Sequence, residues 1–392
     1  MKDEMKKVPR LRFRGFSEDW ELCKLGRVVE RVTRKNKELK STLPLTISAQ
    51  EGLIDQNVFF NKSVASRDVS GYYLIYNGEF AYNKSYSNGY PWGAIKRLNR
   101  YDMGVLSTLY IIFKPKNIDS NFLEKYYDTS CWYHEVSKHA AEGARNHGLL
   151  NIAASDFLRT ELTVPKSVEE QRKIGNFLKQ LDDTITLHQR KLEQLKELKK
   201  AYLQVMFPAK DERVPKVRFA AFEGEWAHRK LGEITESFSG GTPTAGKSEY
   251  YGGDIPFIRS GEISSDSTEL FITENGLNSS SAKMVKVGDI LYALYGATSG
   301  EVGISKITGA INQAILAIRP SKNDNSYLII QWLRKQKNTI ISTYLQGGQG
   351  NLSSSIVKNL IIMLPQNKEE QEKVGIFFKR LDDIITLHQN KL

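Results

Sequence analysis

The sequence predicts an α+β fold: two mixed α/β domains separated by long antiparallel coiled-coil helices, with an internal pseudo-two-fold repeat. Two observations support this prediction. Residues 169–192 (EEQRKIGNFLKQLDDTITLHQRKL) and 369–392 (EEQEKVGIFFKRLDDIITLHQNKL) are identical at 17 of 24 positions. Residues 8–30 and 214–236, which begin VPRLRF and VPKVRF, are identical at 10 of 23 positions. A repeat on this scale indicates that the two halves of the chain share one architecture.

Between the repeated blocks, the two halves differ in sequence but keep one outline. GEFAY at residues 78–82 aligns with GDILY at 288–292, and GVLSTLYIIFKP at 104–115 aligns with GAINQAILAIRP at 309–320. The apolar, Gly- and Pro-bounded runs at 105–113 and 310–318 each predict a buried strand. Helices are predicted over 121–141 and 326–345. Each middle segment is therefore expected to form a globular domain of about 150 residues.

The repeated blocks at 169–192 and 369–392 also carry apolar residues at alternating steps of four and three, the spacing of a coiled-coil seam. The first helix is predicted from Val168 to about Val205, before Pro208, a length of roughly 55 Å. Such a helix cannot bury its stripe alone, so we expect the two copies to pair antiparallel. The predicted seam consists of Ile174, Leu178, Leu181, Ile185, His188, Leu192, Leu195, Val374, Phe378, Leu381, Ile385, His388 and Leu392.

These features predict four parts along the chain. A first domain covers residues 1–165, a central helical spacer 166–208, a second domain 209–365, and a C-terminal helix 366–392. The first helix continues beyond Leu192 as EQLKELKKAYLQVMFP, whereas the second copy stops at Leu392, so its pairing is expected to be shorter.

Histidines and aromatic residues also recur between the halves. His188 and His388 are either a pH-sensitive or metal-binding pair, or polar residues that set the register of the seam. We favour the second interpretation, because no other type of metal ligand accompanies them. The repeated aromatic residues Phe13, Trp20, Phe219 and Trp226 are expected to pack the entry segment of each domain against its core.

The composition limits the class of partner. The 392 residues include 56 Lys and Arg against 45 Asp and Glu, a net charge of +11. A surplus of this size favours a polyanion, nucleic acid first. The two cysteines, Cys23 and Cys131, provide neither a disulfide framework nor a metal-ligand cluster. No apolar run is long enough to span a membrane and the N-terminus lacks a secretory segment, so a cytoplasmic protein with no membrane partner is expected.

Residues 241–248 (GTPTAGKS) match the phosphate-binding pattern G-x-x-x-x-G-K-[ST]. A P-loop needs a buried strand before it and a helix after it. The preceding GEITESFS is polar, and Gly252, Gly253 and Pro256 follow closely, which would stop a helix. We therefore expect another role for this loop, and we keep a P-loop nucleotide-binding protein as the less favoured alternative.

Taken together, the chain resembles the specificity subunit of type I restriction–modification enzymes. The resemblance covers nearly the whole chain. It is carried by VPRLRF and VPKVRF, GGTPT and EYYGGDIPFI, YGATSGEVGI, NQAILAI, and the two EEQ helices with the segments that lead into them. A second alternative of similar architecture is a stand-alone, sequence-specific DNA-binding protein with a regulatory or antirestriction role.

The resemblance implies a non-catalytic DNA-binding subunit with two target-recognition domains. Each domain would read one half of an asymmetric, two-part target in double-stranded DNA, and the helices would set the spacer. Two modification subunits that methylate adenine N6 would dock on the helices, and restriction subunits would join through them. S-adenosylmethionine, ATP and Mg²⁺ would be bound by those partners. No catalytic residue, metal or cofactor is expected in this chain.

The candidate DNA-binding residues are those whose side chains can bond to bases or phosphates. Arg, Asn and Gln can read base edges through paired hydrogen bonds, whereas Lys and hydroxyl groups near Gly-rich loops more often hold phosphates. In the first domain they are Arg34, Lys35, Asn36, Lys37, Asn83, Lys84, Ser85, Tyr86, Ser87, Trp92, Arg145, Asn146 and His147. In the second they are Thr242, Thr244, Lys247, Tyr250, Arg259, Ser260, Tyr295, Thr298, Ser299, Asn312, Gln313, Gln346 and Gln349.

Overall fold

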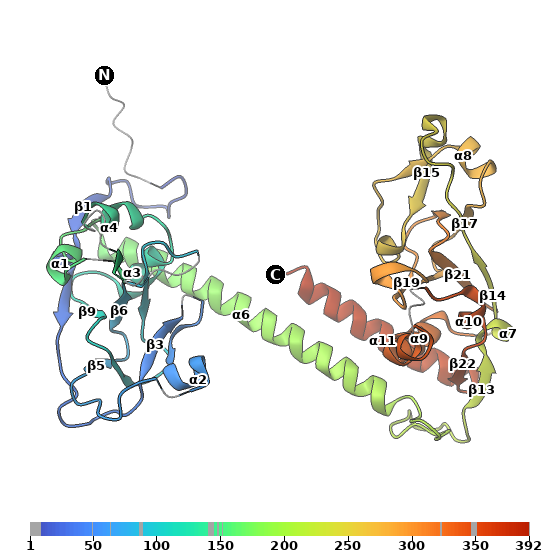
Figure 1. The fold of residues 1–392 in the computed structure, drawn as a ribbon, viewed down its shortest axis with the longest axis horizontal. Coiled ribbons are helices and arrows are strands. Elements are labelled where there is room, and N and C mark those ends of the chain that lie inside the picture. Colours follow the sequence, from blue (N-terminus) through green and yellow to red (C-terminus); the bar gives the residue numbers. More distant parts are fainter. Residues whose placement is uncertain are drawn as a thin grey trace. The chain divides into compact units, whose positions relative to one another are not determined.

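The computed structural model describes residues 9–48, 50–62, 64–85, 89–139, 145–146, 149–150, 152–321, 324–345 and 351–391. The chain divides into two compact units, Met1–Thr186 and Leu187–Leu392, which we call the first and second units. Figure 1 colours the first unit from blue to green and the second from green to red. Each unit is described by itself.

The first unit is built on an antiparallel sheet with the strand order β2–β9–β6–β7. Its strands are β2 (Val29–Val32), β9 (Ile111–Pro115), β6 (Phe80–Asn83) and β7 (Ala94–Arg97). Two-stranded ladders join β1 (Glu21–Lys24) to β12 (Glu161–Val164), β3 (Leu45–Ser48) to β4 (Gly52–Asp55), β5 (Tyr73–Tyr76) to β8 (Met103–Leu106), and β10 (Arg145–Asn146) to β11 (Leu149–Leu150). The helices are α1 (Leu25–Val28), α2 (Gln56–Phe60), α3 (Ser120–Tyr127), α4 (Tyr133–His139), α5 (Ala154–Phe157) and the first part of α6 (Val168–Val205).

The second unit repeats the antiparallel sheet as β14–β21–β18–β19. Its strands are β14 (Thr235–Ser239), β21 (Ile315–Pro320), β18 (Ile290–Ala293) and β19 (Val302–Ile304). A second sheet contains β16 (Phe271–Ile272), β15 (Tyr251–Ile258), β20 (Gly309–Ile311) and β17 (Lys283–Val285), and a ladder joins β13 (Ala227–Lys230) to β22 (Ile361–Leu364). The helical segments are α7 (Leu231–Ile234), η1 (Ser248–Tyr250), η2 (Ser260–Glu262), α8 (Glu274–Asn278), η3 (Gly296–Thr298), α9 (Ser326–Tyr344), α10 (Ser354–Lys358) and α11 (Lys368–Gln389).

The predicted internal repeat is confirmed, because the two units share one sequence of elements. A short ladder strand, one helical turn and a sheet strand open each unit, as β1–α1–β2 and as β13–α7–β14. The closing strand of the same ladder leads into a long helix, as β12–α6 and as β22–α11. The predicted first helix, from Val168 to about Val205, coincides with α6.

The prediction of one strand over 105–113 and one over 310–318 is wrong, because a turn divides each run into two strands. β8 ends at Leu106 and β9 begins at Ile111, while β20 ends at Ile311 and β21 begins at Ile315. At each turn the chain passes from one sheet or ladder to another: β8 pairs with β5, whereas β9 pairs with β2 and β6. Periodicity does not reveal such a turn, because both flanking strands are buried and apolar.

The helix predicted over 326–345 is α9, but the one predicted over 121–141 is broken. α3 ends at Tyr127 and α4 begins at Tyr133. The break lets Trp132, which is 4% exposed, enter the core, where its indole N–H donates to the carbonyl of Tyr127 at 3.2 Å. Burial of this large aromatic side chain outweighs the continuity of the helix.

Each long helix begins at a buried carboxylate that holds the entry segment of its unit. The carboxylate of Glu170 accepts hydrogen bonds from Arg12 Nε at 2.7 Å and from the indole N–H of Trp20 at 3.4 Å. The second unit repeats this arrangement with Glu370, Arg218 (2.6 Å) and Trp226 (3.3 Å). We call these two three-residue contacts the carboxylate joints. They explain why the blocks at 8–30 and 169–192 are repeated together.

The glutamine and the glycine that follow this glutamate in each long helix also make equivalent contacts in the two units. The side-chain carbonyl of Gln171 accepts from the backbone N–H of Asp119 at 2.9 Å, and its amide donates to the carbonyl of Pro165 at 2.8 Å. Gln371 makes the same two contacts, with Asn325 and Pro365. A Cβ atom at Gly175 would collide with the backbone of Asn121 and Phe122, and one at Gly375 with the side chain of Asn325. Glycine is needed at both positions because α6 lies close to the start of α3, and α11 lies close to the start of α9.

Within the second unit, the C-terminal part of α6 lies antiparallel to α11, as predicted. His188 Nδ1 lies 3.3 Å from His388 Nδ1, and further along the helices the rings of Tyr202 and Phe377 are 5.0 Å apart. Among the residues that the structure describes, no group of three or more His, Cys, Asp or Glu side chains could hold a metal ion. The interpretation of these histidines as polar residues that set the register of the seam stays a prediction.

The other predicted seam residues differ in burial. Leu192, Leu195, Val374, Phe378 and Leu381 are at most 8% exposed. In the first unit, Leu181 and Ile185 are 47% and 37% exposed. Ile174, Leu178 and Ile385 are half-buried, and Leu392 lies outside the described residues.

We expect replacement of Arg218 by Met to lower the free energy of unfolding of the second unit by about 3–5 kcal/mol, because it would leave the Glu370 carboxylate buried without its partner. Glu370 is fully buried in the joint. Urea denaturation followed by intrinsic fluorescence would measure the change.

The matched control is Arg213→Met, which removes an ion pair with Glu225 whose side chains are 57% and 60% exposed. It should change the stability by at most about 1 kcal/mol. Equal effects of the two substitutions would contradict a structural role for the carboxylate joint.

Candidate nucleic-acid interface

Several of the predicted residues of the second unit meet where two parallel strands end. β15 and β20 run parallel, with Ile258 opposite Ile311. Arg259 and Asn312 are the next residues, so they leave the same edge of the sheet side by side. This edge resembles the carboxyl ends of parallel strands in open α/β sheets, where ligands are commonly bound.

The loops around this edge add further candidates. The Thr242 hydroxyl hydrogen-bonds the side chain of Gln313, which follows Asn312. The backbone N–H of Leu294 donates to the carbonyl of Ala314 at 2.8 Å, which places Tyr295 beside the same turn. We call Thr242, Arg259, Tyr295, Asn312 and Gln313 the strand-end cluster. Its members come from four separate loops and expose hydroxyl, guanidinium and amide groups that can bond to bases or phosphates.

Two glycines bring the 240–247 loop onto this edge. A Cβ atom at Gly240 would collide with the carbonyl of Ile311, and one at Gly241 with the side chain of Ser281. The backbone N–H of Gly241 donates to the carbonyl of Ile311 at 3.2 Å. The glycines therefore serve close packing of the loop against β20 and Ser281.

The Lys247 loop lacks the geometry of a P-loop. After Lys247 the chain forms only the single turn η1 and enters β15 at Tyr251, so the loop does not lead directly into an α-helix. The Lys247 ammonium donates to the Tyr250 hydroxyl at 3.3 Å, and this hydrogen bond raises the pKa of Lys247. Hydrogen bonds from Ser279 and then from Lys247 lower the pKa of Tyr250. Lys247 and Tyr250 precede β15, whereas Arg259 follows it, so they lie at the other end of that strand from the strand-end cluster.

The remaining candidates of the second unit differ in how exposed their side chains are and in whether these already bond within the protein. Arg259 is half exposed and forms an ion pair with Glu262 at 2.6 Å. Ser299 is 6% exposed, and its hydroxyl donates to the carbonyl of Leu294. Thr244 is exposed, Ser260 lies in η2 and Thr298 in η3. Gln346 and Gln349 lie outside the described residues.

In the first unit, the candidates at 34–37 are partly engaged in the fold. Arg34 pairs with Glu79 at 2.9 Å and lies over the ring of Tyr76. The Lys35 ammonium donates to the carbonyl of Gly71 at 2.8 Å. Asn36 is 1% exposed, and its amide bonds Ser41 and the carbonyl of Val69. The buried amide of Asn36 is thus used within the loop, whereas Lys37 is exposed.

A second group in this unit lies at the end of β6. The carbonyl of Lys84 accepts from the backbone N–H of Leu150, so the segment after Asn83 runs beside the β10–β11 ladder that contains Arg145 and Asn146. The backbone N–H of Ser85 donates to the side chain of Asn83, and burial lowers the pKa of Lys84. Trp92 is half-buried, and its carbonyl accepts from the Tyr82 hydroxyl. Tyr86, Ser87 and His147 lie outside the described residues.

The comparisons with known proteins identify the family. The family model described as "Type I restriction modification DNA specificity domain" matches residues 17–197 and 223–392. The chain belongs to this family. This match confirms the resemblance that was inferred from the sequence. In the part of the chain that the structure describes, no helix is both long and apolar enough to cross a bilayer.

Individual relatives within the family match over shorter stretches. The specificity subunit of the Escherichia coli type I restriction enzyme EcoR124I/EcoR124II is 29% identical over 167 residues, which are 40% of this chain and 41% of the relative. That of the Methanocaldococcus jannaschii enzyme MjaIX is 30% identical over 172 residues, 41% of this chain and 39% of the relative. Each match thus spans about two fifths of the relative.

A solved structure supports the fold across nearly the whole chain. The crystal structure of a type I restriction–modification S subunit from M. genitalium covers 95% of this chain and 92% of its own, with a TM-score of 0.61. At 14% sequence identity, this likeness concerns the fold alone.

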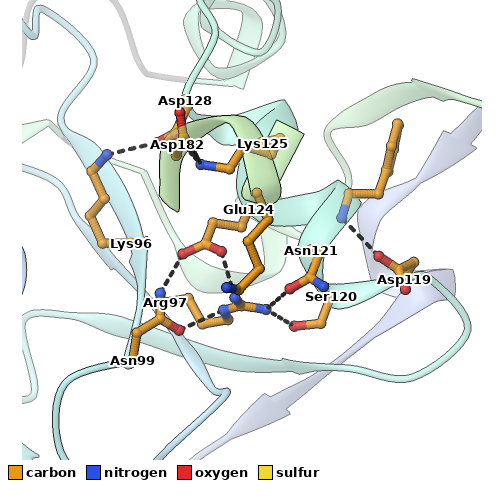
Figure 2. Close-up of polar contacts among 12 residues, drawn as sticks. Lys96, Arg97, Asn99, Asp119, Ser120, Asn121, Glu124, Lys125, Asp128 and Asp182 are labelled. Atoms are coloured by element: carbon orange, nitrogen blue, oxygen red, sulfur yellow. Dashed lines mark hydrogen bonds and ion pairs between the residues drawn. The ribbon is translucent and has the colours of Figure 1, made fainter. Parts of the chain in front are cut away.

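Sequence reasoning missed a polar network in the first unit (Figure 2). Arg97 of β7 pairs with Glu124 of α3 at 2.5 Å and donates to Asn99, Ser120 and Asn121. Lys125 links α3 to Asp182 of α6 at 2.5 Å and to Asp128. The network joins the sheet edge to both helices. The repeat retains Asp182 as Asp382, but Glu124 and Lys125 correspond to Ile330 and Gln331, so the repeat alone does not predict the network.

We expect the Lys247→Ala variant and the unchanged chain to show the same absence of saturable ATP binding. The loop continues into η1 and β15 and not into the α-helix whose N-terminus holds phosphates in a P-loop. Titration with a fluorescent ATP analogue in the presence of Mg²⁺ would measure it. Saturable binding that the Lys247→Ala change removes would restore the P-loop interpretation.

Proposed function

We propose that the chain is the DNA sequence-specificity subunit of a type I restriction–modification complex. The single observation that carries this proposal is the repeat of one recognition scaffold with two different sets of strand-end loops, within a chain of the type I DNA specificity family. Because the loops differ, the two domains would read different sequences and the target would be asymmetric. The chain would supply recognition and no catalytic residue.

The chemistry of the loops supports double-stranded DNA as the ligand. The chain carries a net charge of +11, which favours a polyanion. Asn312 and Gln313 of the strand-end cluster offer amides that can pair with adenine, and Arg259 offers a guanidinium that can pair with guanine. Lys37 and Lys84 in the first domain suit phosphates, which would position the domain without reading sequence.

The helices would fix the gap between the two half-sites and dock the modification subunits. α6 contains 38 residues, a length of about 57 Å, or somewhat over one and a half turns of B-DNA. The modification subunits would methylate adenine N6 with S-adenosylmethionine, and ATP-driven restriction subunits would join through them. A stand-alone DNA-binding protein, the alternative from another class, would bind its site tightly without any modification subunit.

The decisive experiment is a methylome. The chain would be expressed with a type I modification subunit in a host without adenine methylation, and N6-methyladenine would be mapped across the genome. We expect one asymmetric, two-part motif with a fixed gap. Insertion of seven residues into α6 after Arg190 should change only the gap, because seven residues add about two helical turns.

The outcomes are distinguishable. A palindromic or continuous motif would contradict two different readers. A helix insertion that altered either half-site would contradict the role of α6 as a spacer. If tight binding to one site occurred with the chain alone, and no methylation occurred with a modification subunit that co-purifies, the stand-alone alternative would be favoured.

We expect Asn312→Ala to relax base preference at one position of a single half-site, because one bidentate pair contributes about 1–3 kcal/mol of discrimination. The matched control is Asn36→Ala, because the Asn36 amide is buried and bonds within its own loop. That change should lower stability by about 1–3 kcal/mol and leave base preference unchanged. Binding to a panel of single-base variants of the mapped site, with thermal melting in parallel, separates the two effects.

A further inference from the structure

The second unit contains an arginine–glutamate pair in the turn that follows β15. Arg259 Nε donates to one carboxylate oxygen of Glu262 at 3.1 Å, and Nη2 donates to the other at 2.6 Å. The carboxylate also accepts from the backbone N–H of Arg259 at 3.0 Å. The Thr268 hydroxyl lies 3.2 Å from the same carboxylate and 3.1 Å from the carbonyl of Phe257. These contacts hold Glu262 in one position, and Glu262 in turn holds the guanidinium in one direction.

The turn that carries this pair is anchored in the core at both ends. Ile258 and Ile263, which flank it, are 1% and 5% exposed and belong to one apolar cluster. The side chain of Glu262 is 17% exposed, whereas that of Arg259 is 50% exposed. Hydrogen bonds from Arg259 lower the pKa of Glu262, so the carboxylate is charged at neutral pH. A sheltered carboxylate therefore supports a guanidinium that reaches solvent.

The pairing leaves one edge of the guanidinium available. An arginine offers five N–H donors in a planar fork. The bonds to Glu262 use Nε and one side of Nη2, so the edge formed by Nη1 and Nη2 faces away from the carboxylate. Among the residues that the structure describes, no acceptor bonds to Nη1 of Arg259.

Arg34 of the first unit shows the opposite arrangement. Its Nη1 and Nη2 both bond to the carboxylate of Glu79, and Nη1 also donates to the carbonyl of Leu74. Arg34 thus uses within the fold the paired edge that Arg259 presents to solvent. The two arginines were equivalent candidates in the sequence, and their geometry separates them.

The partner of Arg259 also favours a base over a phosphate as its ligand. The charge of Glu262 offsets that of the guanidinium, and the carboxylate would repel a phosphate brought to this turn. A guanine edge carries no net charge, and its O6 and N7 accept from two N–H groups of one guanidinium. The turn is therefore suited to reading guanine in the major groove.

We propose that Arg259 is a specificity-determining residue that reads guanine O6 and N7, and that Glu262 is its positioning residue. Glu262 orients the guanidinium before DNA arrives, so less side-chain freedom is lost on binding. This inference rests on the proposed function, because it assigns one base contact in the half-site of the second domain. It adds that a carboxylate acting only through its arginine controls the choice of that base.

The test uses the full chain in complex with a co-purified modification subunit and selects bound duplexes from a random-sequence DNA library. Arg259→Lys keeps the charge but loses the paired donors, so the preference for guanine at one position should fall by about fivefold or more, with the other positions unchanged. Glu262→Gln should lower the same preference by about threefold or more. Its affinity for random-sequence DNA should stay equal or rise, because a negative charge has been removed.

Two further measurements separate positioning from a structural role. The double variant should lose no more preference than Arg259→Lys alone, because Glu262 acts through Arg259. In the selected duplex, 7-deazaguanine at that position should weaken binding of the unchanged chain and leave Arg259→Lys unaffected, since the N7 acceptor is missing. This substitution alters the DNA alone and so tests the contact even where a variant fails to fold.

The matched control is Glu225→Gln, which removes the same charge from an exposed ion pair with Arg213 in the second unit. It should leave the guanine preference unchanged. Thermal melting would verify that each variant is folded. If Glu262→Gln does not fold, Glu262→Asp replaces it, because the shorter side chain keeps the charge but not the reach, and it should also lower the preference.

The contrary outcomes are distinct. A two-part motif that both Arg259→Lys and Glu262→Gln leave unchanged would overturn this inference alone and leave the proposed function standing. A guanine preference lost in Arg259→Lys but kept in Glu262→Gln would remove the positioning role. An equal loss of affinity for all sequences in Arg259→Ala, with a salt slope smaller by about one, would make Arg259 a phosphate ligand. No selected motif from a folded complex would overturn the proposed function and this inference with it.

Discussion

The rest of the structure depends on the buried carboxylates of Glu170 and Glu370. A carboxylate in an apolar interior is costly unless a charged partner and further hydrogen bonds satisfy it. Arg12 and Arg218 provide these partners from entry segments more than 150 residues away in the sequence. The entry segment, the closing strand and the helix N-terminus of each unit must therefore assemble together. The carboxylates also lie in the first turn of a helix, where negative charge is favoured.

This dependence accounts for which parts of the fold the sequence predicts. The coiled-coil spacing of α6 is a local pattern, and its start and end at Val168 and Val205 were predicted from it. The repeat predicted that Trp20 and Trp226 have one role, although their shared partner, a glutamate, was found only in the structure. The apolar runs at 105–113 and 310–318 were misjudged, because a turn between two buried strands leaves no break in hydrophobicity.

The candidate site was predicted less well, and the reason is physical. Residue type indicates what a side chain can bind but not whether the fold already uses it. Asn36 and Arg34 look like DNA contacts in the sequence, yet the Asn36 amide bonds within its own loop and the Arg34 guanidinium pairs with Glu79, 45 positions away. The strand-end cluster shows a second limit. Its members are up to 71 positions apart: Arg259 and Asn312 come together because β15 and β20 run parallel, and Thr242 and Tyr295 join them through loop contacts, none of which a local pattern shows. Whether these residues touch DNA stays a prediction.

The ladders that close each unit have an evolutionary consequence. β1 pairs with β12 so that Glu21 lies opposite Val164, and β13 pairs with β22 so that Ala227 lies opposite Leu364. The chain thus enters and leaves each variable segment at neighbouring points, about 5 Å apart for paired residues. A genetic exchange with its breakpoints in these strands would replace everything between them without moving either end or breaking a carboxylate joint. Recombination could therefore exchange the middle of one unit in a single event while the helices, and whatever binds them, keep an unchanged interface.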